Sequence, residues 1–156
     1  MTIDPTVLVD DDGRAYIYYG LGSCRWAELN SDMVSLKTSA AAITSGLNSY
    51  FEAPWILKTN GTYFLVYAHG GWPSQMGYAT SNSPAGPWTY RGVFGKPTGT
   101  GTNHAGIGYF RGQWWYAYHT EEVSNGNPYH RSVCVDRLTI TGNTIQPVTY
   151  TSFWMG

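Results

Sequence analysis

The chain has 156 residues, a length that suits one domain, and 42% of them are hydrophobic, which excludes a disordered protein. Charged residues make up 12% and the formal net charge is −1, which excludes a basic surface for nucleic acid or for an anionic membrane. The apolar runs are too short for a transmembrane helix. Aromatic residues reach 16% and there are 19 glycines, which is typical of an all-β protein with many turns and suits a carbohydrate partner.

The first residues, Met1–Asp4, lack the basic and apolar regions of a signal peptide, so we predict none and assign no localisation. Because the sequence starts almost inside a predicted strand, we expect a truncated chain. The two cysteines, Cys24 and Cys134, allow one disulfide, but two free buried thiols are the commoner state.

Three segments follow one pattern of a strand, a tight turn at glycine and a strand rich in aromatic residues. They are Val7–Tyr19 with Gly13, Trp55–Tyr67 with Gly61, and Ile107–Tyr118 with Gly112. Asp-Gly and Asn-Gly pairs are strong hairpin signals because both turn positions favour a positive φ. We read the aspartates at 10–12 in the same way, as turn residues rather than as a metal or catalytic cluster.

Each hairpin is followed by two more predicted strands. The third strands are expected at Cys24–Leu29, Gly77–Ser81 and Ser132–Ile140, and the fourth strands near Val34–Lys37, Trp88–Phe94 and Thr144–Tyr150. A four-stranded antiparallel meander of about 50 residues, used three times, matches the spacing of β-propeller blades. We therefore predict one domain over 1–156, an incomplete propeller with repeats at about 1–48, 49–100 and 101–156. A β-sandwich with three similar hairpins is the alternative.

The repeats place three ionisable residues at equivalent positions. Asp4, Glu52 and His104 each come shortly before the first strand of a repeat, so they should meet at one end of the propeller axis. Two carboxyl groups and an imidazole at that point suit general acid and base chemistry. Each of them alone would be read as a solvated loop residue or a cap.

Loops between second and third strands reach the same end of the propeller. Trp72 lies in a loop rich in glycine and proline, where it can stack against a sugar or fold back on its own blade. Arg131 opens a third strand, where its guanidinium can hold sugar hydroxyls or a carboxylate, or form a salt bridge at the rim.

Four motifs in this order resemble glycoside hydrolase family 43, whose members are five-bladed propeller enzymes acting on arabinan, arabinoxylan and xylan. They are Ile3-Asp4-Pro5, Phe51-Glu52-Ala53-Pro54, Asn103-His104-Ala105-Gly106 and Tyr129-His130-Arg131-Ser132. The resemblance implies that Glu52 is the general acid and that Asp4 tunes its pKa. It also implies that Arg131 contacts the sugar, and that His104 is linked to an axial calcium ion, directly or through water.

The chain departs from that family in having three blades instead of five. By resemblance, the two N-terminal blades would carry the aspartate that acts as general base, and we find no counterpart for it. Glu121 and Glu122 lie on the correct face, where a solvated loop carboxylate is the simpler reading. Because three blades cannot close a ring, we expect a homodimer or a higher assembly that covers the open faces.

Two hypotheses for the function remain. The first is an inverting glycosidase of the arabinofuranosidase or xylosidase type, complete only as an assembly and acting on oligo- or polysaccharides that contain arabinose or xylose. The second is a non-catalytic sugar-binding or structural half-propeller. Glu52 and Asp4 favour the first hypothesis, and the missing general base favours the second.

Overall fold

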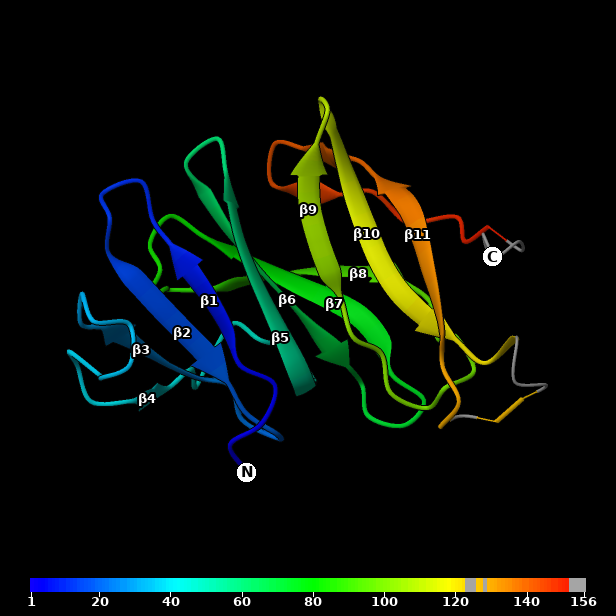
Figure 1. The fold of residues 1–156 in the computed structure, drawn as a ribbon, viewed down its shortest axis with the longest axis horizontal. Helices are drawn as coiled ribbons and strands as arrows, with labels where there is room; N and C mark the ends of the chain where they lie inside the picture. Colours follow the sequence, from blue (N-terminus) through cyan, green and yellow to red (C-terminus); the bar gives the residue numbers. More distant parts are fainter. Residues whose placement is uncertain (123–125, 128, 152–156) are drawn as a thin grey trace.

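The computed structural model describes residues 1–122, 126–127 and 129–151, and its regular elements are all β-strands. They form antiparallel sheets that lie side by side like adjacent blades (Figure 1). The sheet nearest the N-terminus contains β1 (Thr6–Val9), β2 (Ala15–Tyr19), β3 (Arg25–Leu29) and β4 (Ala41–Ala42). The middle sheet contains β5 (Tyr50–Thr59), β6 (Thr62–His69), β7 (Gln75–Ser81) and β8 (Thr89–Gly95).

The last sheet has three strands, β9 (Gly106–Phe110), β10 (Gln113–Thr120) and β11 (Ser132–Leu138). A separate short hairpin, β12 (Ile140–Thr141) with β13 (Thr144–Ile145), follows it. The prediction of an all-β partial propeller built from meanders is therefore confirmed. No helix among the residues that the structure describes is long and apolar enough to span a membrane.

The three predicted hairpins are present, and their turn glycines have the expected positive φ. Gly13, Gly61 and Gly112 have φ values of 82°, 75° and 79°. In the second and third hairpins the preceding residues, Asn60 and Arg111, also have a positive φ of 49°. Two consecutive positive values match the turn type that follows the right-handed twist of the flanking strands.

Two of the three predicted fourth strands are wrong in place. The segment Val34–Lys37 contributes one bridge, between Leu36 and Leu29, and the fourth strand of that sheet is β4. The cause is local, because a carboxylate oxygen of Asp32 accepts hydrogen bonds from the backbone of Val34 and Ser35 and fixes a turn there.

The segment Thr144–Tyr150 was expected to pair with β11, but only its first two residues are a strand, and they pair with β12. Further along, the amide of Val148 donates to the carbonyl of Phe94 at 2.8 Å, so this segment is bonded to β8 instead. The carboxylate of Asp136, on β11, accepts a hydrogen bond from the amide of Thr151 at 3.1 Å, so the residue just after this segment is bonded to β11.

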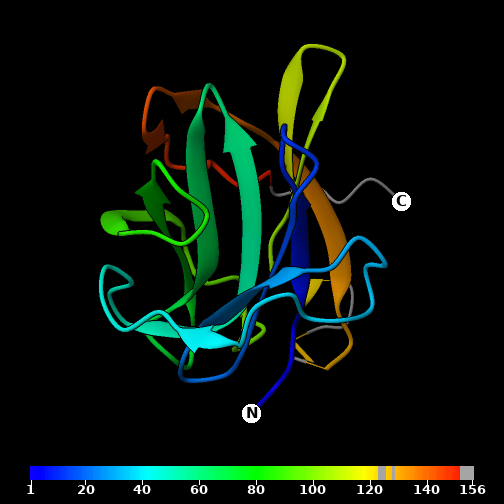
Figure 2. The same cartoon turned by 90° about the vertical axis from the view of Figure 1, so that its left-hand side faces the viewer.

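The core consists of two apolar clusters, one between each pair of neighbouring sheets. Figure 2 gives the same ribbon with the N-terminal sheet toward the viewer. Tyr18 and Tyr67, from neighbouring sheets, are fully buried in one cluster, and Phe64 and Tyr116 in the other. Aromatic residues from the second strand of each sheet therefore fill both interfaces, which accounts for the aromatic content of the sequence. Both cysteines are free and buried.

An ion pair between a buried carboxylate and a half-buried lysine joins the first two sheets at the end where the hairpin turns lie. Asp10 accepts hydrogen bonds from the Lys58 ammonium and the Tyr63 hydroxyl, and Lys58 also contacts Asp11 at 2.9 Å. Burial raises the pKa of Asp10, but these hydrogen bonds outweigh it, so the net shift is downward. Asp10 is thus a link between sheets as well as a turn residue.

We predict that Asp10→Ala lowers the free energy of unfolding by about 2–3 kcal/mol, because it leaves Lys58 and Tyr63 without their shared acceptor. This corresponds to a Tm lower by about 5–10 °C in a thermal melt. Asp11→Ala is the matched control. Its carboxylate contacts the same lysine but its side chain is 88% exposed, so it should cost less than about 1 kcal/mol.

The effect of Asp10→Ala on stability should also depend on pH. The lowered pKa of Asp10 means that its contribution is present above the ordinary value of 3.8 and is lost as the pH falls below it. Equal destabilisation by the two substitutions at pH 7 would contradict this account of the interface.

Candidate functional site

Asp4, Glu52 and His104 come together at one end of the sheets, which we call the site end. Each offers one ligand atom, and these atoms lie within 4.8 Å of one another. The Nε2 of His104 is 3.9 Å from Oε1 of Glu52. Residues about 50 positions apart in the sequence therefore meet, one at the start of each sheet.

One detail differs from the sequence prediction. Glu52 was expected to precede its strand, but it lies within β5, which starts at Tyr50. The pairing with β6 shifts register on both sides of Glu52, and Ala53 has a φ of 54°. A strand irregularity of this kind turns a side chain away from the regular alternation, and such irregularities are common next to active sites.

Backbone hydrogen bonds between the β2–β3 loop and the two acidic segments fix the site end. The amide of Gly20 donates to the carbonyl of Ile3 at 3.0 Å, and that of Gly22 donates to Phe51 at 2.7 Å. The Tyr50 hydroxyl donates to the Gly20 carbonyl at 2.7 Å. The residues that precede Asp4 and Glu52 are therefore bonded to one shared loop.

Burial and charge both act on Glu52. Its side chain is 12% exposed, and loss of solvent is the main cause that raises its pKa above the ordinary value. The Asp4 carboxylate raises the pKa further, whereas His104 and Arg131 oppose the shift. Such an environment favours the protonated carboxyl group that general acid catalysis requires.

Trp72 lies with one side of its indole ring against Gly101. A Cβ added to Gly101 would lie 2.1 Å from the ring atom Cζ2, so only glycine allows this contact. The side chain is still 62% exposed. The loop tryptophan therefore rests on residue 101 and offers an open surface.

Arg131 is exposed at the start of the last sheet's third strand. One of its Nη2 protons is donated to the Thr102 hydroxyl at 3.2 Å. The structure gives it no ion pair among the residues that it describes, so the rim salt bridge considered above is absent from that part of the chain.

His119 was missed by the sequence reasoning, although it is close to the site. It is the second-to-last residue of β10, and its ring centroid lies 6.0 Å from that of His104. Burial, together with Arg131 and His104, lowers its pKa to about 4. A histidine at the end of the equivalent strand, His69, was the signal that could have drawn attention to it.

Neither glutamate proposed as a replacement base belongs to the acidic cluster. Within the described residues, the group of close ligand atoms contains Asp4, Glu52 and His104 only. The carboxylate of Glu121 instead lies against Gly99, where an added Cβ would be 2.6 Å from Oε1.

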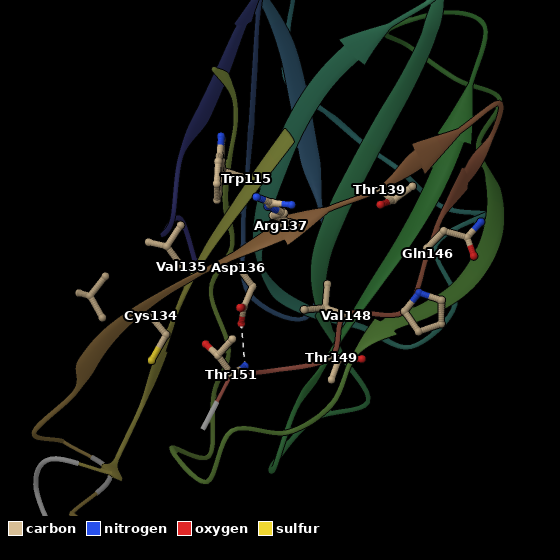
Figure 3. Close-up of a pocket in the computed structure, with 12 residues that line it drawn as sticks. Trp115, Cys134, Val135, Asp136, Arg137, Thr139, Gln146, Val148, Thr149 and Thr151 are labelled. Atoms are coloured by element: carbon tan, nitrogen blue, oxygen red, sulfur yellow. Dashed lines mark hydrogen bonds between the residues drawn. The ribbon is translucent and has the colours of Figure 1, made fainter. Parts of the chain in front are cut away.

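A separate hollow of about 850 Å³ lies along β11 and the segment after β13 (Figure 3). Its lining includes Trp115, Val133, Val135 and Val148. None of the three clustered residues lines it, so this hollow is distinct from the site end.

A family model of glycosyl hydrolases family 43 matches residues 1–145. The chain is 37% identical over 145 residues to a β-D-galactofuranosidase, xynD, of Aspergillus niger, covering 87% of this chain and 42% of the relative. It is also 37% identical over 152 residues to an arabinoxylan arabinofuranohydrolase of Bacillus subtilis, covering 78% of this chain and 29% of the relative. The chain thus spans less than half the length of these relatives.

Solved structures of glycoside hydrolases also match most of this chain. A β-xylosidase/α-arabinofuranosidase from a compost microbial metagenome, in complex with xylotriose and in calcium-free form, matches with a TM-score of 0.87 and 31% identity. The match covers 94% of this chain and 58% of that chain. A Xanthomonas citri enzyme complexed with xylotriose matches with a TM-score of 0.87, 29% identity, and coverage of 94% and 56%.

The charges around Glu52 predict that two substitutions shift its pKa in opposite directions. Asp4→Asn should lower the pKa of Glu52 because it removes a nearby negative charge, and Arg131→Met should raise it because it removes a positive one. The pKa can be measured by ¹³C NMR titration of carboxyl-labelled glutamate, with Glu52 assigned by Glu52→Gln.

Asp32→Asn serves as a control for this titration, since Asp32 is bonded within its own turn. It should leave the pKa of Glu52 unchanged. A shift in the same direction for Asp4→Asn and Arg131→Met would contradict the assigned electrostatics.

Proposed function

The chain belongs to glycosyl hydrolases family 43, and from this premise we propose that its site end hydrolyses pentoside linkages of hemicellulose. The bond cleaved is an α-L-arabinofuranoside or a β-xyloside. The names of the relatives support this substrate class, since they include arabinoxylan arabinofuranohydrolases and xylosidase/arabinosidases. The observation that carries the proposal is the convergence of Asp4, Glu52 and His104 on one point.

In this proposal Glu52 is the general acid that protonates the leaving oxygen. Its burial and the neighbouring Asp4 carboxylate keep it protonated at a higher pH than a solvated glutamate. Asp4 acts through this electrostatic effect. As the Glu52 proton passes to the leaving oxygen and the bond between that oxygen and the anomeric carbon breaks, water attacks this carbon from the opposite face and gives its own proton to a base.

Three further side chains bind the sugar in this proposal. The exposed indole of Trp72 is a stacking platform for the C–H face of a pentose ring. Arg131, whose guanidinium is exposed beside the cluster, donates hydrogen bonds to hydroxyl groups. His104, whose side chain is 38% exposed, faces Glu52 from the third sheet and contacts the same sugar.

The donor set also bears on the calcium ion that the family resemblance implied. Calcium prefers six to eight oxygen ligands, whereas the cluster offers two carboxylates and one imidazole nitrogen. The set fits calcium when His104 holds the ion through water, which leaves Glu52 free to donate its proton. We propose this arrangement; the ion, when bound, supplies positive charge near the reacting sugar.

An inverting mechanism also requires a base about 6.5–9.5 Å from the acid to activate water. The ligand atom of Asp4, the other carboxylate of the described cluster, lies within 4.8 Å of that of Glu52, which is closer than this separation, so Asp4 does not fill the role. We propose that the base comes from a second copy of the chain. Without a base, a loss of about 10²–10⁴-fold in rate is expected.

The outward faces of the terminal sheets support such an assembly. Val133 and Val135 on β11 are 71% and 46% exposed, and they line the hollow in Figure 3. Val7 and Val9 on β1 are 44% and 60% exposed. Two copies related by a two-fold axis would cover these apolar faces and form a six-bladed ring.

We predict a dimer in sedimentation velocity at micromolar concentration. Val133→Asp combined with Val135→Asp should convert it to a monomer, because buried unpaired charges oppose association. Lys58→Arg serves as the control and should remain dimeric. It keeps the charge, and Lys58 pairs with Asp10 between the first two sheets instead of lying on β11. A folded wild-type monomer at all concentrations would contradict the assembly.

The second candidate function is sugar binding without turnover. The observation that favours it is that Asp4, the other carboxylate of the described cluster, lies too close to Glu52 to serve as the base of an inverting mechanism. Under this alternative the chain binds arabinose or xylose, and substitution of Glu52 leaves any background hydrolysis unchanged.

The two functions are separated by release of the aryl group from aryl arabinofuranosides and aryl xylosides. We predict turnover by the wild type and at least a 100-fold lower rate for Glu52→Gln, which keeps the shape but cannot donate the proton in the same way. Glu28→Gln is the matched control. Glu28 forms an ion pair with Lys37, in which the nitrogen and oxygen are 2.8 Å apart, and it does not belong to the cluster.

The assay should be run after chelation and again with added calcium, which is expected to restore the rate. Turnover that is unaffected by Glu52→Gln, or no turnover with measurable sugar binding, would reject the hydrolase and support the sugar-binding function.

A further inference from the structure

A group of polar residues beside the site is buried although the proposed reaction does not use it. Ser74, Thr100 and Asn103 are each 1% exposed, and Thr102 is 9% exposed. Buried polar groups are costly unless each of them finds a partner, so such a group is retained only where its hydrogen bonds are satisfied. Its contacts therefore show which segments it holds together.

Asn103 is the centre of this group. Its backbone amide donates to the Ser74 hydroxyl at 2.7 Å, and its side-chain amide donates to the carbonyls of Ser74 at 3.0 Å and Lys96 at 3.2 Å. Its side-chain oxygen accepts a hydrogen bond from the Thr98 hydroxyl at 3.0 Å. Four hydrogen bonds thus tie the residue before His104 to the middle sheet's loop and to the segment that leaves β8.

The same loop carries the tryptophan. Ser74 is two residues after Trp72, and its amide donates to the carbonyl of Gly101 at 2.7 Å. Gly101 is the residue on which the Trp72 ring rests. The position of the indole relative to His104 is therefore set by the hydrogen bonds that pass through Ser74 and Asn103.

The threonines extend this network toward the other side of the site. The Thr100 hydroxyl donates its proton to the carbonyl of Thr102 at 2.8 Å, so its 3.0 Å contact with Nδ1 of His119 requires that the imidazole donate. Thr102 in turn accepts the hydrogen bond from Arg131. One short segment, residues 98–103, thus contacts the groups that flank the acidic cluster.

We propose that Asn103 is a positioning residue, which holds the Trp72 platform at a fixed place relative to His104 and the sugar. This inference rests on the proposed sugar-binding role of Trp72 but adds a residue that touches no substrate. Loss of its side chain removes the hydrogen bonds to Ser74, Lys96 and Thr98 and frees the loop that carries the indole. Misplacement of a binding group by about 1 Å is enough to weaken a site strongly.

The test uses the protein labelled with 5-fluorotryptophan, in which ¹⁹F NMR gives one resonance for each tryptophan and Trp72→Phe assigns the resonance of Trp72. Asn103→Ala should shift or broaden that resonance. Asn82→Ala is the matched control, because Asn82 is exposed after β7, and it should leave the resonance unchanged. Gly101→Ala is the positive control, since its Cβ cannot coexist with the observed ring position.

The kinetic counterpart is a split between KM and kcat. Asn103→Ala should raise KM for an aryl pentoside, or the dissociation constant for xylotriose, by about tenfold. Partial unfolding would instead lower the apparent kcat at constant KM. If Asn103→Ala does not fold, Ser74→Ala removes only the hydroxyl that accepts from the Asn103 amide and should shift the same resonance.

An unchanged Trp72 resonance in a folded Asn103→Ala or Ser74→Ala variant would overturn the positioning role. A wild-type protein that binds no sugar would reject the proposed function, while the ¹⁹F resonance would still decide whether Asn103 positions the indole. A shifted resonance with unchanged KM and affinity would also overturn the inference, because the platform would then not act on the sugar.

Discussion

The backbone hydrogen bonds between neighbouring sheets at the site end are the constraint on which the rest of the structure depends. The β2–β3 loop is bonded to Ile3 and to Phe51, and Ser74 is bonded to Gly101. Because each meander starts at the same end, these bonds bring the first strands of all three sheets to one point. Side chains that are distant in the sequence then share one environment, in which burial, and after it the Asp4 carboxylate, raises the pKa of Glu52.

This arrangement has an energetic cost at the site end, which the remainder of the fold offsets. Asp4 and Ala53 have φ values of 55° and 54°, a region that residues other than glycine adopt at a cost of about 1 kcal/mol or more. The two carboxyl groups also repel each other. The aromatic interfaces and the Asp10–Lys58 pair, at the opposite end of the first strands, supply the compensating contacts.

Sequence patterns predicted the features that depend on nearby residues or on the spacing of the repeat. The hairpins follow from glycine at a positive φ, and the meeting of Asp4, Glu52 and His104 follows from equal spacing in a repeat. Patterns failed where a distant partner decides the structure. The last predicted fourth strand is displaced because Val148 is bonded to Phe94, and the buried role of Asn103 depends on a loop about thirty residues away. Neither effect leaves a period or a composition bias in the sequence.

The central claim is that Glu52 donates the proton in a hydrolytic site built by three sheets. The most direct test compares the pH dependence of kcat/KM for an aryl pentoside with the pKa of Glu52 in the same protein. The account predicts that kcat/KM falls as the pH rises through that pKa, because only the protonated carboxyl group can act as the acid. Activity that stays constant or rises across the titration of Glu52 would contradict it.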